Sequence, residues 1–99
     1  MERQVAEQIA EILRAIAHPI RLSVIELLAG SEMSVSEIVE ALGQRQAAVS
    51  HQLNLMKDKG ILVSRRDGTK VYYRLDNPNI VKVLQCVQSH YPTNGGVSP

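Results

Sequence analysis

A single glycine, Gly43, separates two short stretches of the chain in which apolar residues recur with the spacing of an α-helix. The first stretch, residues 34–42, begins with Ser34 and has Glu37 three residues later, a pair that forms a capping box at a helix start. The second stretch covers residues 45–59. Because glycine readily adopts the left-handed conformation that ends a helix, this pattern predicts two helices joined by a tight turn. Such a pair is a helix-turn-helix.

Two further helices are predicted before this pair. Apolar residues with helical spacing run from Val5 to Ala17, and Pro19 stops that helix and can occupy the first turn of the next one. We expect His18, beside Pro19, to cap a helix or to form a hydrogen bond in the core, and not to be a metal ligand. The second helix is apolar over most of its circumference and ends at Gly30, so its expected place is the middle of the core.

After residue 60 the pattern changes from helical to extended. The segment ILVSRRDGTKVYYRL contains two runs rich in β-branched and aromatic residues on either side of Asp67-Gly68, a dipeptide typical of two-residue hairpin turns. It predicts a two-stranded hairpin. The residues expected to alternate on its packed face are Val63, Val71 and Tyr73.

The last predicted element is a helix outlined by apolar residues from Ile80 to Tyr91, after the interruption DNPN. The predicted fold is therefore mainly α (α+β): a winged helix-turn-helix with five helices and a two-stranded β-hairpin wing, in the order ααααββα. With 99 residues the chain fits one domain. We assign this domain to residues 1–91 and expect residues 92–99 to form a flexible C-terminal tail.

The net charge of +1 conceals an uneven distribution along the chain. Residues 1–43 carry three arginines and seven glutamates, whereas residues 44–74 carry seven basic and two acidic residues. A basic segment on an acidic scaffold is typical of a surface that meets a polyanion. The hairpin tip belongs to this basic segment.

The helix predicted at residues 45–59 has an outer face that is almost free of charge. Its apolar side is formed by Val49, Leu53 and Met56. The DNA major groove admits one α-helix and displays hydrogen-bond donors and acceptors on base edges, which suits a face of small and polar side chains. The residues predicted to contact DNA are Arg45, Gln46, Ala47, Ser50, His51, Asn54, Arg65, Arg66 and Lys70.

Two roles are predicted within this set. The four cations would neutralise phosphates and hold the register of the complex without reading its sequence. The five uncharged helix residues would read base edges, with Ala47 leaving room for a thymine methyl group. An alternative function is a winged helix that binds an acidic protein partner through its basic hairpin.

Other classes of function find little support. Ser50 and His51 are neighbours on a helix and point about 100° apart, so they cannot form an activated nucleophile, and we predict that the protein is not an enzyme. No apolar run reaches the roughly 18 residues of a membrane span, and the first residues do not resemble a signal peptide. With Cys86 as its one cysteine, the chain is expected to be cytoplasmic and to have no membrane partner.

Three segments resemble the ArsR (arsenical-resistance repressor) family of small winged-helix regulators: AHPIRLSVIELL, SVSEIVEALG and QAAVSHQLNLMKDKGILVSRRDGTKVYYRL. The resemblance extends from about Ala10 to His90. It implies a bacterial-type transcriptional repressor that forms a homodimer through its first and last helices. Each subunit would present its helix to one half of an inverted repeat in double-stranded DNA, and an effector would release it.

Two positions depart from the family pattern in the DNA-contacting helix. Arg45 stands where relatives often have a serine or threonine cap. Where many relatives have S-x-H-L, this chain reads Ser50-His51-Gln52-Leu53. These departures leave the operator sequence open but not the mode of binding.

The metal ligands that the resemblance would imply are missing. Ser34 and Ser36 occupy the cysteine positions of the arsenic- and lead-type sensors, and serine hydroxyls do not replace soft thiolates. At the zinc and nickel positions the chain has Asn77, Asn79, His90 and Thr93. Only one of these four is a usual zinc ligand, so we predict no metal and no cofactor.

Cys86 and His90 are the remaining candidates for an effector site. They are four residues apart and therefore lie on one side of the last helix. In a dimer, two copies of each could form a Cys₂His₂ cluster or a thiol switch, which makes a thiol- or metal-responsive sensor a further alternative. The simpler alternative is that Cys86 packs as a small apolar residue and His90 is a cation at the helix end.

Overall fold

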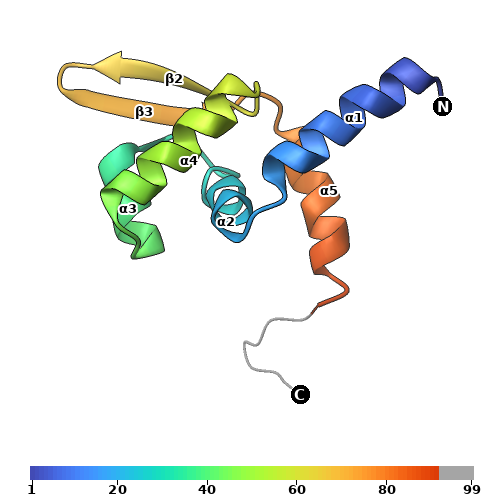
Figure 1. The fold of residues 1–99 in the computed structure, drawn as a ribbon. Coiled ribbons are helices and arrows are strands. Elements are labelled where there is room, and N and C mark those ends of the chain that lie inside the picture. Colours follow the sequence, from blue (N-terminus) through green and yellow to red (C-terminus); the bar gives the residue numbers. More distant parts are fainter. Residues whose placement is uncertain (92–99) are drawn as a thin grey trace.

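The computed structural model describes residues 1–91 and arranges them as five α-helices and three β-strands (Figure 1). The elements are α1 (Arg3–Ile16), α2 (Pro19–Leu27), β1 (Met33–Ser34), α3 (Val35–Leu42), α4 (Gln46–Asp58), β2 (Leu62–Asp67), β3 (Lys70–Leu75) and α5 (Asn79–Gln88). The winged helix-turn-helix that the sequence predicts is confirmed. The predicted tail at residues 92–99 lies outside the described residues. No helix within residues 1–91 is long and apolar enough to cross a membrane.

The helix-turn-helix is formed by α3 and α4. At the start of α3, the Ser34 hydroxyl accepts a hydrogen bond from the Glu37 amide at 3.2 Å, and the Glu37 carboxylate accepts one from the Ser34 amide at 2.8 Å. This is the predicted capping box. Gly43 ends α3 in the left-handed region with φ of +64°, which explains the glycine at the tight turn.

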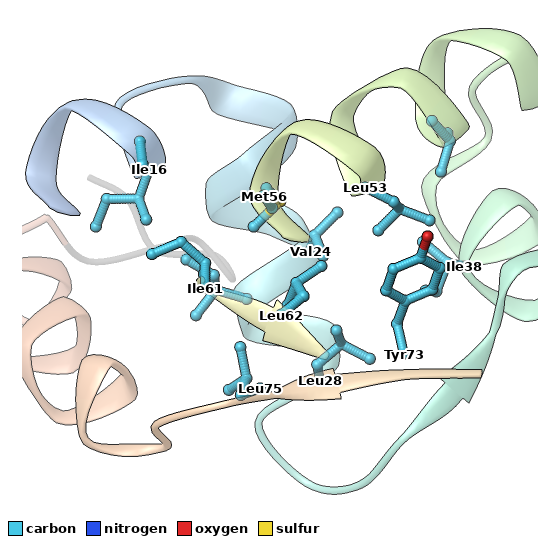
Figure 2. Close-up of a cluster of buried hydrophobic side chains, with 13 residues drawn as sticks. Ile16, Val24, Leu28, Ile38, Leu53, Met56, Ile61, Leu62, Tyr73 and Leu75 are labelled. Atoms are coloured by element: carbon cyan, nitrogen blue, oxygen red, sulfur yellow. The ribbon is translucent and has the colours of Figure 1, made fainter. Parts of the chain in front are cut away.

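The core lies where α2, α3 and α4 meet one face of the sheet (Figure 2). The predicted apolar side of α4 is confirmed, because Val49, Leu53 and Met56 are all fully buried. Helix α2 starts as predicted, with the His18 Nδ1 accepting a hydrogen bond from the Ile20 amide at 3.1 Å. It is not buried on all sides, however, because its Leu22 is 39% exposed.

The sheet has three strands instead of the predicted two. Its order is β1-β3-β2 and both pairings are antiparallel, with Met33 of β1 opposite Tyr73 of β3. Strand β1 contains only two residues, which are too few to show an alternating pattern in the sequence. The wing itself is still the predicted hairpin of β2 and β3.

The turn of the hairpin lies one residue later than predicted. Asp67 pairs with Lys70, so the two loop residues are Gly68 and Thr69. Gly68 has a φ of +66°, and no residue other than glycine in the described part of the chain has a positive φ. Glycine adopts a positive φ without steric cost, which explains why it is the first of the two loop residues.

This register places Val63 on the other face of the hairpin from Val71 and Tyr73, so its predicted place on the packed face was wrong. Val63 pairs with Arg74, whereas Tyr73 pairs with Ser64. Directly paired residues point to the same face, and faces alternate along each strand. The face that packs towards α4 therefore carries Ser64, Arg66, Val71 and Tyr73.

Candidate nucleic-acid interface

Helix α4 presents its uncharged outer face to solvent. The opposite side is held in the core by three fully buried residues, and this fixes the rotation of the helix about its axis. The small or polar side chains predicted to read bases are exposed except for Ser50, which is half-buried; the exposed ones are Gln46, Ala47, His51 and Asn54. The structure thus brings all five predicted base-reading residues to one accessible side of one helix.

Arg45 occupies the N-cap position of α4 and makes no side-chain cap hydrogen bond. The first amide groups of a helix have no partner within the helix, and they carry the positive end of its dipole. An exposed arginine adds a further positive charge at this end instead of a capping oxygen. The start of α4 is therefore suited to an anion such as a phosphate.

The hairpin stands beside α4, and the space between them is hollowed into two adjoining cavities. One has a volume of about 340 Å³ and is lined by Gln46, Ser50, Asn54 and Lys70, among others. The other has a volume of about 400 Å³, and its lining includes Asn54, Lys57 and Arg66. Together they form a trough with the polar side of α4 on one wall and basic residues along its length.

Arg65, Arg66 and Lys70 are the hairpin cations that line this trough. All three are exposed, and within residues 1–91 Arg66 and Lys70 form no ion pair with an acidic side chain. Arg66 pairs with Val71 across the hairpin and so shares the face that packs towards α4. Cations without an ion pair near α4 can neutralise the phosphates of a DNA backbone.

Arg65 is placed differently from Arg66. Its Nε donates to both carboxylate oxygens of Glu32 at 3.1 Å, and its Nη2 also contacts this carboxylate. The guanidinium lies over the Tyr72 ring, 4.5 Å from the centroid. The hydrogen bond from Arg65 lowers the pKa of the Glu32 carboxyl, and the same bond raises the pKa of Arg65. Arg65 is therefore engaged with the segment that precedes β1.

Two hydrogen bonds to α4 were not anticipated from the sequence. The Tyr73 hydroxyl donates to the Asn54 Oδ1 at 3.4 Å, and the Arg21 Nε donates to the Gln52 Oε1 at 2.7 Å. The same guanidinium donates to the Ala15 carbonyl at the end of α1 at 3.2 Å. The partners are 19 and 31 residues apart in the chain, so no local pattern reports them.

Cys86 and His90 are both exposed at the C-terminal end of the described chain. Helix α5 ends at Gln88, so His90 lies in the turn beyond the helix, where its amide donates to the Val87 carbonyl at 3.1 Å. The predicted last helix was thus too long by about one turn. Residues 1–91 contain no group of three or more His, Cys, Asp or Glu side chains that could hold a metal ion.

Helices α1 and α5 lie at the end of the molecule away from the hairpin tip (Figure 1). Both helices leave apolar side chains exposed. No residue of α5 is buried, and α1 buries only Ala15 and Ile16. The exposed apolar residues of these two helices are Val5, Ile9, Ile12, Leu13, Val83 and Val87. Exposed apolar side chains that gather on neighbouring elements are typical of a protein interface.

Comparisons with known proteins agree with these features. The family described as "Bacterial regulatory protein, arsR family" matches residues 18–64. The chain is 34% identical over 84 residues to the HTH-type transcriptional regulator NmtR of Mycobacterium tuberculosis, and the match covers 85% of this chain and 70% of that protein.

Two solved structures are similar over almost the whole chain. The transcriptional repressor BigR of Xylella fastidiosa has a TM-score of 0.83 at 26% identity, covering 95% of this chain and 100% of that one. The homodimeric winged helix-turn-helix DNA-binding domain Mb0332 of Mycobacterium bovis, described as a possible ArsR-family transcriptional regulator, has a TM-score of 0.79 at 29% identity, covering 99% and 96%.

Proposed function

This chain belongs to the ArsR family of bacterial regulatory proteins, which are transcriptional regulators and not enzymes, and on that premise we propose that it represses transcription by binding an inverted repeat in double-stranded DNA as a homodimer. The observation that carries this proposal is the exposed, uncharged face of α4 beside a trough bordered by basic side chains. A helix of this kind fits the major groove while the cations reach the backbone.

The predicted contact residues divide into base-reading and phosphate-binding groups. In our proposal the base-reading residues are Gln46, Ala47, Ser50, His51 and Asn54, which line the accessible side of α4. Arg45, Arg66 and Lys70 bind phosphates. Arg65, expected from the sequence to do the same, also lines the trough, and its hydrogen bonds to Glu32 support an additional role in positioning the wing.

The homodimer is proposed to form through α1 and α5. Their exposed apolar residues support this assignment, as does the homodimeric state given for the similar Mycobacterium bovis domain. A two-fold symmetric dimer presents two copies of α4 in opposite directions, which matches an inverted repeat.

The test is to select DNA sites from a randomised duplex library with the purified chain and then to measure Kd for the selected site against salt. We expect an inverted repeat, and an affinity that falls by roughly 10³ to 10⁵ between about 50 and 200 mM salt if 6 to 10 phosphates are contacted. Ser50→Ala and His51→Ala should change the selected sequence. Equal binding to every duplex would contradict the proposed sequence specificity, and no binding to any duplex would favour the protein-partner alternative.

A further inference from the structure

Lys57 is a basic residue of the trough that was not among the residues predicted from the sequence to contact DNA. It lies in the last turn of α4, is exposed, and forms no ion pair with an acidic side chain within residues 1–91. It lines the cavity of about 400 Å³ together with the hairpin residues Ser64, Arg65 and Arg66. A cation of α4 therefore shares this cavity with two cations of the hairpin.

The charged residues around the trough all have the same sign. No acidic residue lines either of its two cavities, whereas the cations that do so are Lys57, Arg65, Arg66 and Lys70. Like charges that gather in one hollow repel each other, and an anion placed between them is attracted by all of them. Ser64, Tyr73 and Asn54 add uncharged hydrogen-bond donors to the same cavity. The trough is therefore suited to an oxyanion.

A lysine in the last turn of a helix also interacts favourably with the negative end of the helix dipole. Lys59 lies at the C-cap of the same helix, so this interaction is available to both lysines. Lys59, however, lies on the other side of α4, where it lines a separate cavity with Glu11 and Arg14. The helix dipole therefore does not explain why Lys57 lies beside the hairpin cations.

The shape of DNA indicates which oxyanion meets the trough. In B-DNA a sugar-phosphate strand separates the major groove from the adjacent minor groove. With the outer face of α4 in the major groove, the strand that borders this groove on the hairpin side has to pass between α4 and the hairpin. The Tyr73 hydroxyl donates to the Asn54 Oδ1 at 3.4 Å and so joins the two walls of the trough. Phosphates of that strand would meet cations from both walls.

We infer that Lys57 is a further phosphate-binding residue, and that Lys57 and Arg66 bind the same DNA strand where it crosses the trough. This inference rests on the proposed function. Within it, Lys57 contacts the strand from α4 and Arg66 contacts it from β2. Both residues position the duplex and neither reads its bases.

The first experiment measures Kd against salt concentration for the selected DNA site. Lys57→Gln should reduce the slope of log Kd against log salt concentration by about 0.9 for each phosphate that the dimer no longer neutralises. The side chain is exposed, so this variant leaves the core unchanged. Lys57→Arg keeps the charge and should retain the parental slope. Lys59→Gln is the matched control, because it removes the same charge near the same helix end but outside the trough, and it should also retain the parental slope.

A second experiment locates the phosphates by replacing them one at a time with uncharged methylphosphonates. In the parent chain each replacement of a contacted phosphate should weaken binding by roughly two- to fivefold. The phosphate that Lys57 binds is the one whose replacement has no further effect in Lys57→Gln but the full effect in Lys59→Gln. The phosphate found in the same way with Arg66→Gln should lie on the same strand, at the same or the next position.

The inference is overturned if Lys57→Gln retains the parental slope, or if Lys57→Gln and Arg66→Gln identify phosphates on different strands. An equal reduction of the slope in Lys59→Gln would also overturn it, because the loss of a positive charge anywhere near the end of α4 would then explain the effect. A parent chain that binds no duplex would contradict the proposed function instead.

Discussion

Two neighbouring arginines in the wing have different surroundings because side chains alternate along a strand. Both arginines line the trough beside α4, but the register places Arg66 on the face that carries Val71, whereas Arg65 lies on the opposite face and is bound by Glu32. The sequence places both residues near the turn but does not separate them, because the register that decides their faces depends on which two residues form the loop. The two side chains should therefore contribute differently to DNA binding.

The variants Arg66→Ala and Arg65→Ala compare the contributions of the two side chains to DNA binding. Each neutralised phosphate adds about 0.9 to the slope of log Kd against log salt concentration. We expect Arg66→Ala to reduce the slope by about this amount for each phosphate that the dimer no longer neutralises, with equal effects on all duplexes. Arg65→Ala should leave the slope nearly unchanged. A reduced slope in Arg65→Ala with a parental slope in Arg66→Ala would show that the two roles are reversed.

The ion pair between Arg65 and Glu32 also predicts a dependence of stability on pH. The hydrogen bond from Arg65 lowers the pKa of folded Glu32 from its ordinary value of 4.5. A lowered pKa stabilises the fold above the ordinary value, and this contribution is lost as the pH falls through the pKa of the folded state. Glu32→Gln should therefore lower Tm slightly at pH 7 and make Tm fall less steeply below pH 4.5.

Thermal unfolding followed by circular dichroism at a series of pH values measures this difference. The effect should be small because the Arg65 side chain is 52% exposed and that of Glu32 is 32% exposed, and about 1 M salt should remove most of it. Glu40→Gln is a suitable control, since Glu40 is exposed and forms no ion pair within residues 1–91. A parental pH profile in Glu32→Gln would show that the ion pair contributes nothing to the fold.

At the scale of helices and strands, the sequence predicted those elements whose signals are local. The capping box of Ser34 and Glu37 and the left-handed Gly43 lie within ten residues of each other, and together they determine the turn between α3 and α4. Strand β1 was not predicted from the sequence because its residue Met33 pairs with Tyr73, forty positions further along the chain. The hydrogen bonds of Asn54 and Gln52 were not predicted for the same reason, because their partners lie on other elements, far away in the chain.

The bond between Arg21 and Gln52 joins three helices and can be measured as a coupling. Arg21 of α2 donates to Gln52 of α4 and to the last turn of α1 through the Ala15 carbonyl. Gln52→Ala should lower the free energy of unfolding by about 1 kcal/mol, and Arg21→Ala by about 1.5–3 kcal/mol because it removes two charge-assisted bonds. The double variant should lose less than the sum, since the two side chains share one interaction.

Urea unfolding of the parent, both single variants and the double variant completes this thermodynamic cycle. A coupling energy of about 0.5 kcal/mol or more is expected for residues that touch each other. Strict additivity would show that the two side chains stabilise the fold independently of each other, despite their separation of 2.7 Å.

For the molecule as a whole, the distribution of apolar surface is uneven. The helix-turn-helix and the sheet enclose the core, whereas α5 has no buried residue and α1 has two. Helices of 14 and 10 residues gain little stability in water unless an apolar face is covered. The sequence identified both helices by their periodicity, but the periodicity does not distinguish a face that packs within the chain from one that packs against a second copy.

Val87→Asp tests the proposed dimer and its role in binding DNA. Val87 is 57% exposed on α5, so an aspartate there should leave the single subunit folded but place an unpaired charge in the interface. We expect sedimentation to change from dimer to monomer, and the affinity for an inverted repeat to fall by roughly 10² or more, because the two half-sites are no longer bound together. Cys86, one position earlier on α5, should then react faster with a thiol reagent. The control variant Gln85→Asp introduces the same charge on the opposite side of this helix and should retain the dimer. If Val87→Asp stays dimeric and binds DNA with the parental affinity, the dimer interface lies elsewhere.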